Sequence, residues 1–390
     1  MKTLVAFALA ASLATPLHLG AQQQGSVNED EDAFPLAPAR HLQFDEHEGT
    51  WVSLDVSPDG KTIVFELLGD LYRMSIAGGK AQCIVCGLPF DSQPAYSPDG
   101  SMISFVSDRS GNENLWVARG DGTEPRQLST LDDNSVFISP AWSADGKSIY
   151  VSRFKPDINA FELFRYGLDD SSAEQITHAK ATPLTPKPYR TSALGAAASP
   201  DGRFLYYASK TGLGFDDDNV FPLWHIVRRN LATGDEETVV NAEGSAFRPQ
   251  VSPDGRFLAY ATRFQGKTGL RIRNLTNDED AWLIYPIQRD DQEASASRDL
   301  IPRYAFTPDN ESVVLNYGGL IHRIDLASRD VSTIPFDVHV DLPMGPYLRQ
   351  SIREDTGPVR ARLIQTPSQS TDGKRLVFSA LAHVYDYVAR

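Results

Sequence analysis

The chain has 390 residues, of which 41% are hydrophobic and 10% aromatic, a composition typical of a folded protein rather than a disordered one. Its formal net charge of −14 is the opposite of the basic surface that phosphate backbones require. We therefore expect no nucleic-acid partner.

The N-terminus has the pattern of a secretory signal peptide over residues 1–21. Lys2 supplies the positive charge, Leu4 to Leu13 the apolar segment, and Gly20-Ala21 the small residues for cleavage. The apolar segment is too short to span a bilayer, and no later run reaches about 18 apolar residues, so we expect no membrane span. The sequence thus predicts a periplasmic or secreted protein, with an uncleaved N-terminal anchor as the alternative. Residues 22–38 are polar and acidic and are predicted to be a disordered linker.

Residues 39–390 contain seven copies of one four-residue turn, either Ser-Pro-Asp-Gly or a close variant. The copies begin at Ser57, Ser97, Ser143, Ser199, Ser252, Thr307 and Ser370. Serine bonds the local backbone, proline presets φ, and glycine tolerates the left-handed conformation, so the motif predicts a type I turn with a bulge between antiparallel strands. We expect the aspartates of these turns to be structural. A turn that recurs at such intervals indicates a propeller or a solenoid.

Short runs of β-branched and aromatic residues follow each turn, such as Ile63-Val64-Phe65, and predict buried strands. In the first repeat we expect strands at 51–56, 61–67, 70–76 and 80–85, and in the second at 94–97, 102–107, 114–118 and 126–129. Four antiparallel strands per repeat form a WD40-like propeller blade. The predicted fold is therefore all-β: a β-propeller of four-stranded antiparallel blades, seven in number.

The seventh repeat is incomplete, because only strands near 375–379 and 383–388 follow its turn. Arg40-His41-Leu42 resembles Arg126-Gln127-Leu128, which forms a fourth strand at the same distance before the next turn. We therefore predict that the N-terminal strand at Arg40 to Phe44 completes the last blade and closes the ring without an open sheet edge.

The two cysteines, Cys83 and Cys86, form a C-x-x-C pair. Such a pair can be a local disulfide, a redox centre or half of a zinc site. No second C-x-x-C or histidine pair supplies the other half of a zinc site, so we favour a structural pair, bridged or not.

No sequence motif for catalysis is present: there is no G-x-S-x-G elbow, no Walker loop and no G-x-G-x-x-G. His47-Glu48 does not begin H-E-x-x-H, because Trp51 occupies the place of the second histidine. The acidic run from Asp216 to Asn219 offers oxygen ligands for calcium, but it is better explained as a solvated insertion. We therefore predict no catalytic residue, no cofactor and no metal ligand, and expect the tryptophans, Trp51, Trp116, Trp142, Trp224 and Trp282, to pack in the core.

The repeats resemble those of TolB-like propellers, in which the turn and an apolar strand are followed by S-D-R-x-G, here Ser107 to Gly111. The chain is most similar to the N-terminal propeller of exported bacterial amidohydrolase-family proteins, through Glu48 to Trp51, Leu54 to Gly60, Leu68 to Tyr72 and Asn114 to Trp116. That family would bring a metal-dependent hydrolase domain with a His-x-His motif, which this sequence lacks.

The sequence therefore favours an exported TolB-like propeller that acts as a protein-interaction or accessory module, derived from or a fragment of a propeller–amidohydrolase. Its partner would be a protein or peptide at the propeller face or channel. The first alternative is the non-catalytic part of a metal-dependent amidohydrolase whose hydrolase domain lies outside this chain. The second is a peptidase-associated propeller.

Overall fold

The computed structural model describes residues 38–178, 182, 184–186, 189–211, 221–292, 298–345 and 357–388. The chain divides into two compact units, Met1–Gly345 and Pro346–Arg390. The predicted signal peptide (1–21), nearly all of the predicted linker (22–38) and the acidic run from Asp216 to Asn219 lie outside the described residues.

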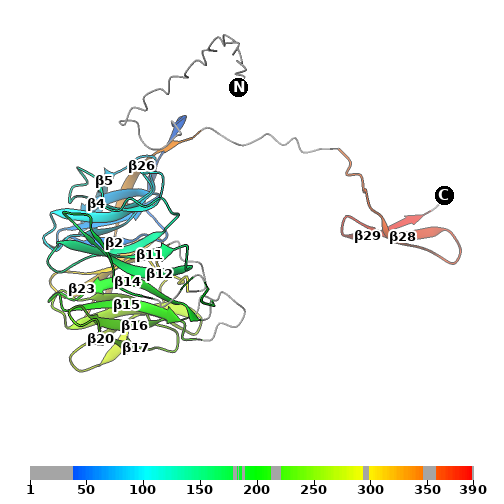
Figure 1. Ribbon diagram of the computed structural model, residues 1–390. Helices are drawn as coiled ribbons and strands as arrows, with labels where there is room; N and C mark the ends of the chain where they lie inside the picture. The colour runs from blue at the N-terminus through cyan, green and yellow to red at the C-terminus, as the bar shows by residue number, and fades with distance from the viewer. Residues whose placement is uncertain are drawn as a thin grey trace, which may run out of the picture. The chain divides into compact units, whose positions relative to one another are not determined.

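The described residues of the first unit form six sheets, in which every strand pair but β26–β5 is antiparallel as expected (Figure 1). Each sheet contains four strands that are consecutive in the sequence, and the first of these six blades carries two more. The blade strands are β2 (Leu54–Val56), β3 (Thr62–Leu67), β4 (Asp70–Ser75), β5 (Gly79–Val85), β6 (Asp91–Tyr96), β7 (Met102–Ser107), β8 (Asn114–Arg119), β9 (Arg126–Gln127), β10 (Phe137–Trp142), β11 (Ser148–Lys155), β12 (Ala160–Gly167), β13 (Ala173–Gln175), β14 (Thr191–Ala198), β15 (Phe204–Thr211), β16 (His225–Asn230), β17 (Glu236–Val240), β18 (Phe247–Val251), β19 (Phe257–Phe264), β20 (Lys267–Asn274), β21 (Asp280–Ile284), β22 (Ala305–Phe306), β23 (Ser312–Tyr317), β24 (Leu320–Asp325) and β25 (Val331–Ile334). The strands predicted for the first two repeats are confirmed to within a few residues at their ends.

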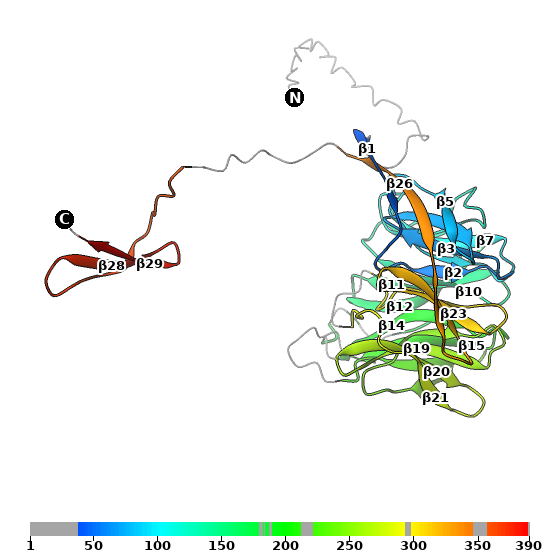
Figure 2. The same ribbon diagram turned by 180° about the vertical axis from the view of Figure 1, so that it is seen from behind.

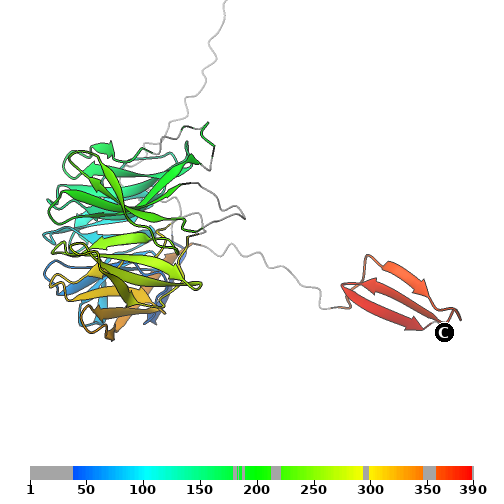
Figure 3. The ribbon, with the colours of Figure 1, turned by 90° about the horizontal axis from the view of Figure 1, so that it is seen from below.

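The six blades of the described residues close into a ring. In Figure 3 the first blade (blue) and the sixth (yellow to orange) lie at the same end of the unit. The first strands of neighbouring blades contact one another in chain order, and β2 of the first blade contacts β22 and β23 of the sixth. At this junction the Leu54 N–H donates to the Arg303 carbonyl at 3.2 Å, and the Asn316 side chain donates to the Gly49 carbonyl at 3.0 Å. Seven blades are therefore not confirmed: the ring of the described residues has six.

The hydrophobic core lies between neighbouring blades rather than at the centre of the ring. Val64 and Leu71 of the first blade pack against Ile103 and Phe105 of the second, and all four are fully buried. Similar layers separate the other blades. Each such side chain contributes about 1.5–3 kcal/mol by leaving water, so the interfaces between blades hold the ring together.

The N-terminal strand does not complete a seventh blade, and that prediction is wrong. β1 (Arg40–Glu46) pairs antiparallel with β26 (Phe336–Met344), and β26 pairs parallel with β5 of the first blade (Figure 2). The order β1-β26-β5-β4-β3-β2 makes one six-stranded sheet, in which β26 and β1 extend the outer edge of the first blade. The open edge of the first blade is nevertheless covered, by β26, a strand that follows the sixth blade.

The second unit contains the seventh repeat as a sheet of its own, with β27 (Gln365–Gln369), β28 (Arg375–Ala380) and β29 (His383–Val388) in sequence order. The two strands predicted after the last turn are confirmed. The sheet has three strands in the described part of this unit.

Candidate functional site: a funnel at the centre of the ring

The repeated turns are held by one set of hydrogen bonds. In the first copy the Ser57 hydroxyl donates to Asp59 Oδ1 at 2.6 Å, and the Lys61 N–H donates to the same oxygen at 3.1 Å. Gly60 has φ of 71°, as the left-handed end of the turn requires. The Ser-to-Asp or Thr-to-Asp bond recurs in the other six copies. These bonds lower the pKa of Asp59, and they give the turn aspartates the structural role that was expected.

The turns of the six blades surround the mouth of a cavity of about 420 Å³, which we call the funnel. Its rim is formed by the second residue of each turn: Pro58, Pro98, Ala144, Pro200, Pro253 and Pro308. Further along the inner strands its wall includes the small residues Ala141, Ala197 and Ala305 and the aromatic residues Tyr96, Trp142 and Phe306. Asp55, Gln250 and Arg303 supply polar atoms among these apolar residues.

Each of the six blades also contributes one residue to a mostly polar set, of which Arg303 lines the funnel as well. These residues occupy one equivalent position, four residues before each turn: Ser53, Gln93, Ser139, Gly195, Arg248 and Arg303. In four of the six blades the pairing of the first two strands shifts at this position, and the residue has a positive φ: Gln93, Ser139, Gly195 and Arg248. A bulge of this kind re-aims a side chain, so the repeat places this set of residues around the ring axis.

A buried carboxylate links several of these blades. Asp299 is 4% exposed and accepts a hydrogen bond from Arg248 Nη1 at 2.8 Å and another from the Ser139 hydroxyl. Gly195 leaves the space that this contact needs: a Cβ there would stand 2.9 Å from Asp299 Oδ2, and its φ is 67°. A buried charge is tolerated only when it is paired and hydrogen-bonded, so this cluster locks the third, fifth and sixth blades in one arrangement.

Arg303 and Asp55 form a second pair, which lines the funnel itself. Arg303 Nη2 lies 3.4 Å from Asp55 Oδ2, and Arg303 Nη1 donates to the Pro140 carbonyl at 2.9 Å. Burial raises the pKa of Asp55, while Arg303 and the backbone N–H of Tyr96 act in the opposite direction. Burial likewise lowers the pKa of Arg303, so desolvation disfavours the charged form of both partners.

Two residues that line the funnel each carry a buried side-chain donor without a hydrogen-bond partner among the described residues: Gln250 Nε2 and Arg303 Nε. An unsatisfied buried donor costs about 1–3 kcal/mol, and a ligand acceptor that reached these groups would recover this energy. The residues that line the funnel in the described ranges include no histidine, cysteine or lysine. Among these lining residues there is thus no nucleophile–base pair of the kind that uses histidine, cysteine or lysine.

Other residues singled out in the sequence lie away from the funnel or at its wall. Trp116, Trp142 and Trp224 are buried as expected, whereas Trp51 and Trp282 are half-buried, and Trp142 also lines the funnel. Cys83 and Cys86 form a disulfide, one of the two forms left open. Their sulfurs and a carboxylate oxygen of Asp70 lie within 4.8 Å of one another, but the sulfurs are bonded to each other, so we assign no metal to this group.

The sequence analysis missed the central residues four positions before each turn. A signal was present, because counting back from the repeated turn aligns Gln93, Ser139, Arg248 and Arg303, which are all polar. Asp299 could not be found in this way, since it lies outside the repeat pattern and reaches the cluster only through the closed ring.

The sequence and the fold are similar to those of several known proteins. Residues 36–215 match the family model of the TolB beta propeller domain, PD40. An uncharacterized protein of Agrobacterium fabrum is 26% identical over 238 residues, which cover 57% of this chain and 71% of that protein. The TolB homolog of Chlorobium luteolum is 23% identical over 140 residues, or 36% of this chain and 28% of that protein. An uncharacterized peptidase of Bacillus subtilis, YuxL, is 37% identical over 62 residues, or 16% of this chain and 9% of that protein.

Among solved structures, TolB from Acinetobacter baumannii matches with a TM-score of 0.52 at 16% identity, over 74% of this chain and 65% of that one. At that identity the likeness concerns the fold. The fold and the funnel define the class as a six-bladed β-propeller with a central cavity. The sequence matches add that it is TolB-like, although the chain spans only part of the length of TolB and the peptidase. Among the described residues no helix is long and apolar enough to cross a membrane.

Proposed function

We propose that this chain is an exported TolB-like propeller that acts as a protein-interaction or accessory module and binds a peptide segment of its partner in the funnel. The observation that carries the proposal is a cavity whose apolar rim and aromatic wall are combined with polar residues, two of which, Gln250 and Arg303, carry a buried donor without a partner among the described residues. Backbone carbonyls and carboxylates of a peptide are acceptors that match them. The matches to TolB proteins and the predicted signal peptide support an envelope partner in the periplasm.

The chemistry of the rim supports a peptide rather than a sugar or a nucleotide. Proline side chains offer apolar surface and no N–H, so the rim can pack against side chains without competing for hydrogen bonds. Tyr96, Trp142 and Phe306 add aromatic surface, which is enriched where proteins bind one another. The five prolines are exposed or half-exposed, and the partner segment would cover them.

Site-specific photocrosslinking in the cell tests the proposal. A photoreactive residue at Pro98 on the rim is expected to give a discrete protein adduct, which mass spectrometry identifies. Ala144→Trp fills the mouth of the funnel from its rim, at a half-buried position, and is expected to abolish the adduct. Val331→Trp is the matched control, because it places the same side chain on an exposed position of the outer strand β25 and should leave the adduct unchanged. An adduct that survives Ala144→Trp would exclude the funnel as the binding site.

The first alternative is that this propeller is the non-catalytic part of a metal-dependent amidohydrolase. The resemblance noted in the sequence favours an ancestor or partner domain of that family, and a coding sequence downstream of residue 390 that contains a His-x-His motif would support it. The purified chain should hydrolyse no amide or cyclic amide when zinc is added. Metal-dependent turnover by this chain alone would contradict the non-catalytic proposal.

A peptidase-associated propeller is the second alternative, favoured by the short match to YuxL. It predicts a hydrolase domain encoded next to the propeller. A serine-hydrolase probe that labels the purified chain would contradict our proposal that this chain is non-catalytic.

A further inference from the structure

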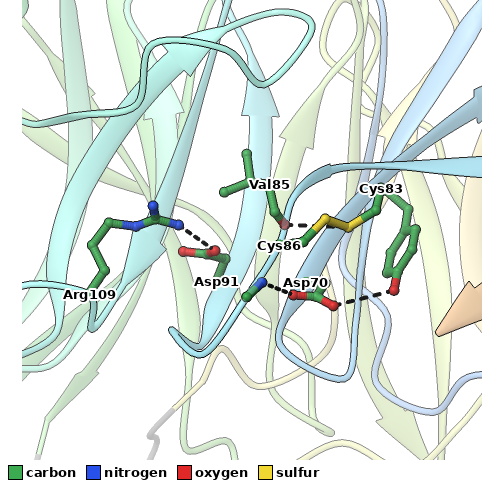
Figure 4. Close-up of a disulfide and its surroundings, with 8 residues drawn as sticks. Asp70, Cys83, Val85, Cys86, Asp91 and Arg109 are labelled. Atoms are coloured by element: carbon green, nitrogen blue, oxygen red, sulfur yellow. Dashed lines mark hydrogen bonds and ion pairs between the residues drawn. A yellow bond between two sulfur atoms is a disulfide. The ribbon is translucent and has the colours of Figure 1, made fainter. Parts of the chain in front are cut away.

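The disulfide lies at the outer end of the first blade, beside a buried carboxyl group (Figure 4). Cys83 belongs to β5, and Cys86 follows directly after the strand, with 6.3 Å between the two Cα atoms. The carboxyl group of Asp70, at the start of the neighbouring strand β4, has an oxygen within 4.8 Å of both sulfurs.

The cross-link adds little restraint to the fold. It closes a loop between residues only three apart, and the stabilisation from a disulfide grows with the length of the loop that it closes. Cys83 is also held already by strand pairing, opposite Tyr72 of β4. A structural role alone therefore does not account for the pair.

The two cysteine residues differ in solvent exposure. The Cys86 residue is exposed, whereas Cys83 is half-buried. An incoming thiolate can thus reach Cys86 Sγ from solvent, and the electron pair of the broken bond would leave on Cys83 Sγ, the inner sulfur.

A carboxylate oxygen of Asp70 lies within 4.8 Å of that inner sulfur, a separation that one water molecule can bridge for proton transfer. Asp70 is 1% exposed, and burial raises its pKa to about 6. One oxygen accepts the Gly87 N–H at 3.0 Å and the other the Tyr72 hydroxyl at 3.4 Å, and Asp70 forms no ion pair among the described residues. Asp91, the next buried carboxylate, differs because it is bound to Arg109 at 2.8 Å.

The charged groups around Asp70 act in the same direction as burial. Asp91 of β6 and Asp341 of β26 are both negative and both favour the neutral form of Asp70. Tyr72 of the same strand acts against them as a hydrogen-bond donor, and its own pKa is raised by burial, so it stays protonated. On β5 the disulfide itself carries no charge.

We propose that Cys83 and Cys86 form a redox-active disulfide that exchanges with a dithiol partner, and that Asp70 transfers the proton to and from Cys83. The partner thiolate attacks Cys86 Sγ, a mixed disulfide forms, and the bond to Cys83 breaks. The Cys83 thiolate that leaves takes the proton of the Asp70 carboxyl group. A second thiol of the partner, as its thiolate, then attacks the partner's sulfur in the mixed disulfide and releases Cys86 as a thiolate that solvent protonates.

The balance of this exchange is one disulfide reduced and one dithiol oxidised. In the reverse direction the Asp70 carboxylate accepts the proton of Cys83, and the resulting thiolate attacks a mixed disulfide at Cys86. Asp70 therefore acts as acid in one direction and as base in the other, as general acid–base catalysis of a reversible step requires.

The experiment follows reduction of the oxidised full-length chain by dithiothreitol between pH 4.5 and 8. Samples are quenched with acid and alkylated, and mass spectrometry counts the free thiols. The second-order rate constant is divided by the dithiothreitol thiolate concentration, so that the remaining pH dependence belongs to the protein. We expect the wild-type value to fall roughly tenfold across a midpoint near pH 6, as Asp70 loses its proton.

The variant Asp70→Asn keeps an acceptor for the Gly87 N–H and is expected to give a flat profile, within about twofold, because it has no proton to transfer. Asp341→Asn is the matched control: it removes one negative charge nearby, from an exposed residue that does not touch the disulfide, and should keep the wild-type slope.

An unchanged slope in Asp70→Asn would overturn the role of Asp70. A wild-type disulfide that is reduced only after the chain has been unfolded in denaturant would overturn the redox role itself. The outcome is independent of whether the funnel binds a peptide.

Discussion

Substitution of Asp70 by asparagine should change how the stability of the ring depends on pH. The pKa of Asp70 is raised from 3.8 to about 6 in the folded chain, chiefly by burial. Between these two values the folded state binds more protons than the unfolded state, so stability falls as pH rises. At about 1.36 kcal/mol for each unit of pKa, ionisation of Asp70 costs about 3 kcal/mol once pH exceeds 6.

Most of this cost should appear within an accessible range. At pH 4.5 the unfolded carboxyl group is already largely ionised, so about 1 kcal/mol of the cost is present and about 2 kcal/mol remains to be lost by pH 7.5. Relative to wild type, Asp70→Asn should therefore gain about 2 kcal/mol of unfolding free energy between pH 4.5 and pH 7.5. Other buried carboxyl groups, such as Glu113, are common to both proteins and cancel in the difference.

Urea unfolding without reductant, followed by tryptophan emission, measures this difference. All five tryptophans, Trp51, Trp116, Trp142, Trp224 and Trp282, belong to the first compact unit, so the signal reports the ring alone. Asp341→Asn is a control for sign: hydrogen bonds from Gln43 and His41 lower the pKa of Asp341, so its removal should cost stability as pH rises. A difference between Asp70→Asn and wild type that stays constant with pH would refute the reasoning.

Three further substitutions test the centre of the ring and its turns. Arg248→Met leaves Asp299 buried without its ion-pair partner and should lower the free energy of unfolding in urea by about 3–5 kcal/mol. The double variant that also carries Asp299→Asn should lose less than the sum of the two single variants. Strictly additive losses would contradict the pairing. Gly195→Ala places a Cβ against Asp299 at a φ of 67° and should cost at least about 1–2 kcal/mol, and a neutral result would show that the centre is not closely packed. Asp145→Ala should lower the melting temperature at pH 7, because the carboxylate accepts the hydrogen bonds of its turn at that pH. This difference from wild type should vanish as pH falls through the lowered pKa of Asp145. A difference that persists at low pH would show that the effect does not come from the ionised carboxylate.

The segment from Phe336 to Met344 shows where sequence reasoning stopped short. Phe336, Val338 and Val340 alternate with polar residues and are buried, so the pattern of a half-buried strand was readable. Its partners were not readable, because Phe336 pairs with Gly79 and Met344 with Arg40, each more than 250 residues away. The N-terminal segment was therefore identified correctly as a strand, but its partner is β26 and not the last blade.

The features of the candidate site also fall into two groups, those that the sequence could predict and those that it could not. The turns that place the rim prolines could be predicted from four-residue motifs, and the polar residues four positions earlier share that register. The distance between Arg248 and Asp299, or between Arg303 and Asp55, could not be predicted, since each depends on blades that meet only when the ring closes.

The sequence by itself determined the repeat, the turns and most of the blade strands, because each rests on the conformational preferences of a few neighbouring residues. Tertiary structure alone decided that the described residues form a ring of six blades, that β26 separates β1 from the first blade, and that the lining of the central funnel includes two residues with donors unpaired among the described residues. The physical reason is that ring closure depends on contacts between the first blade and the sixth, and no local preference records which distant edge a strand will find.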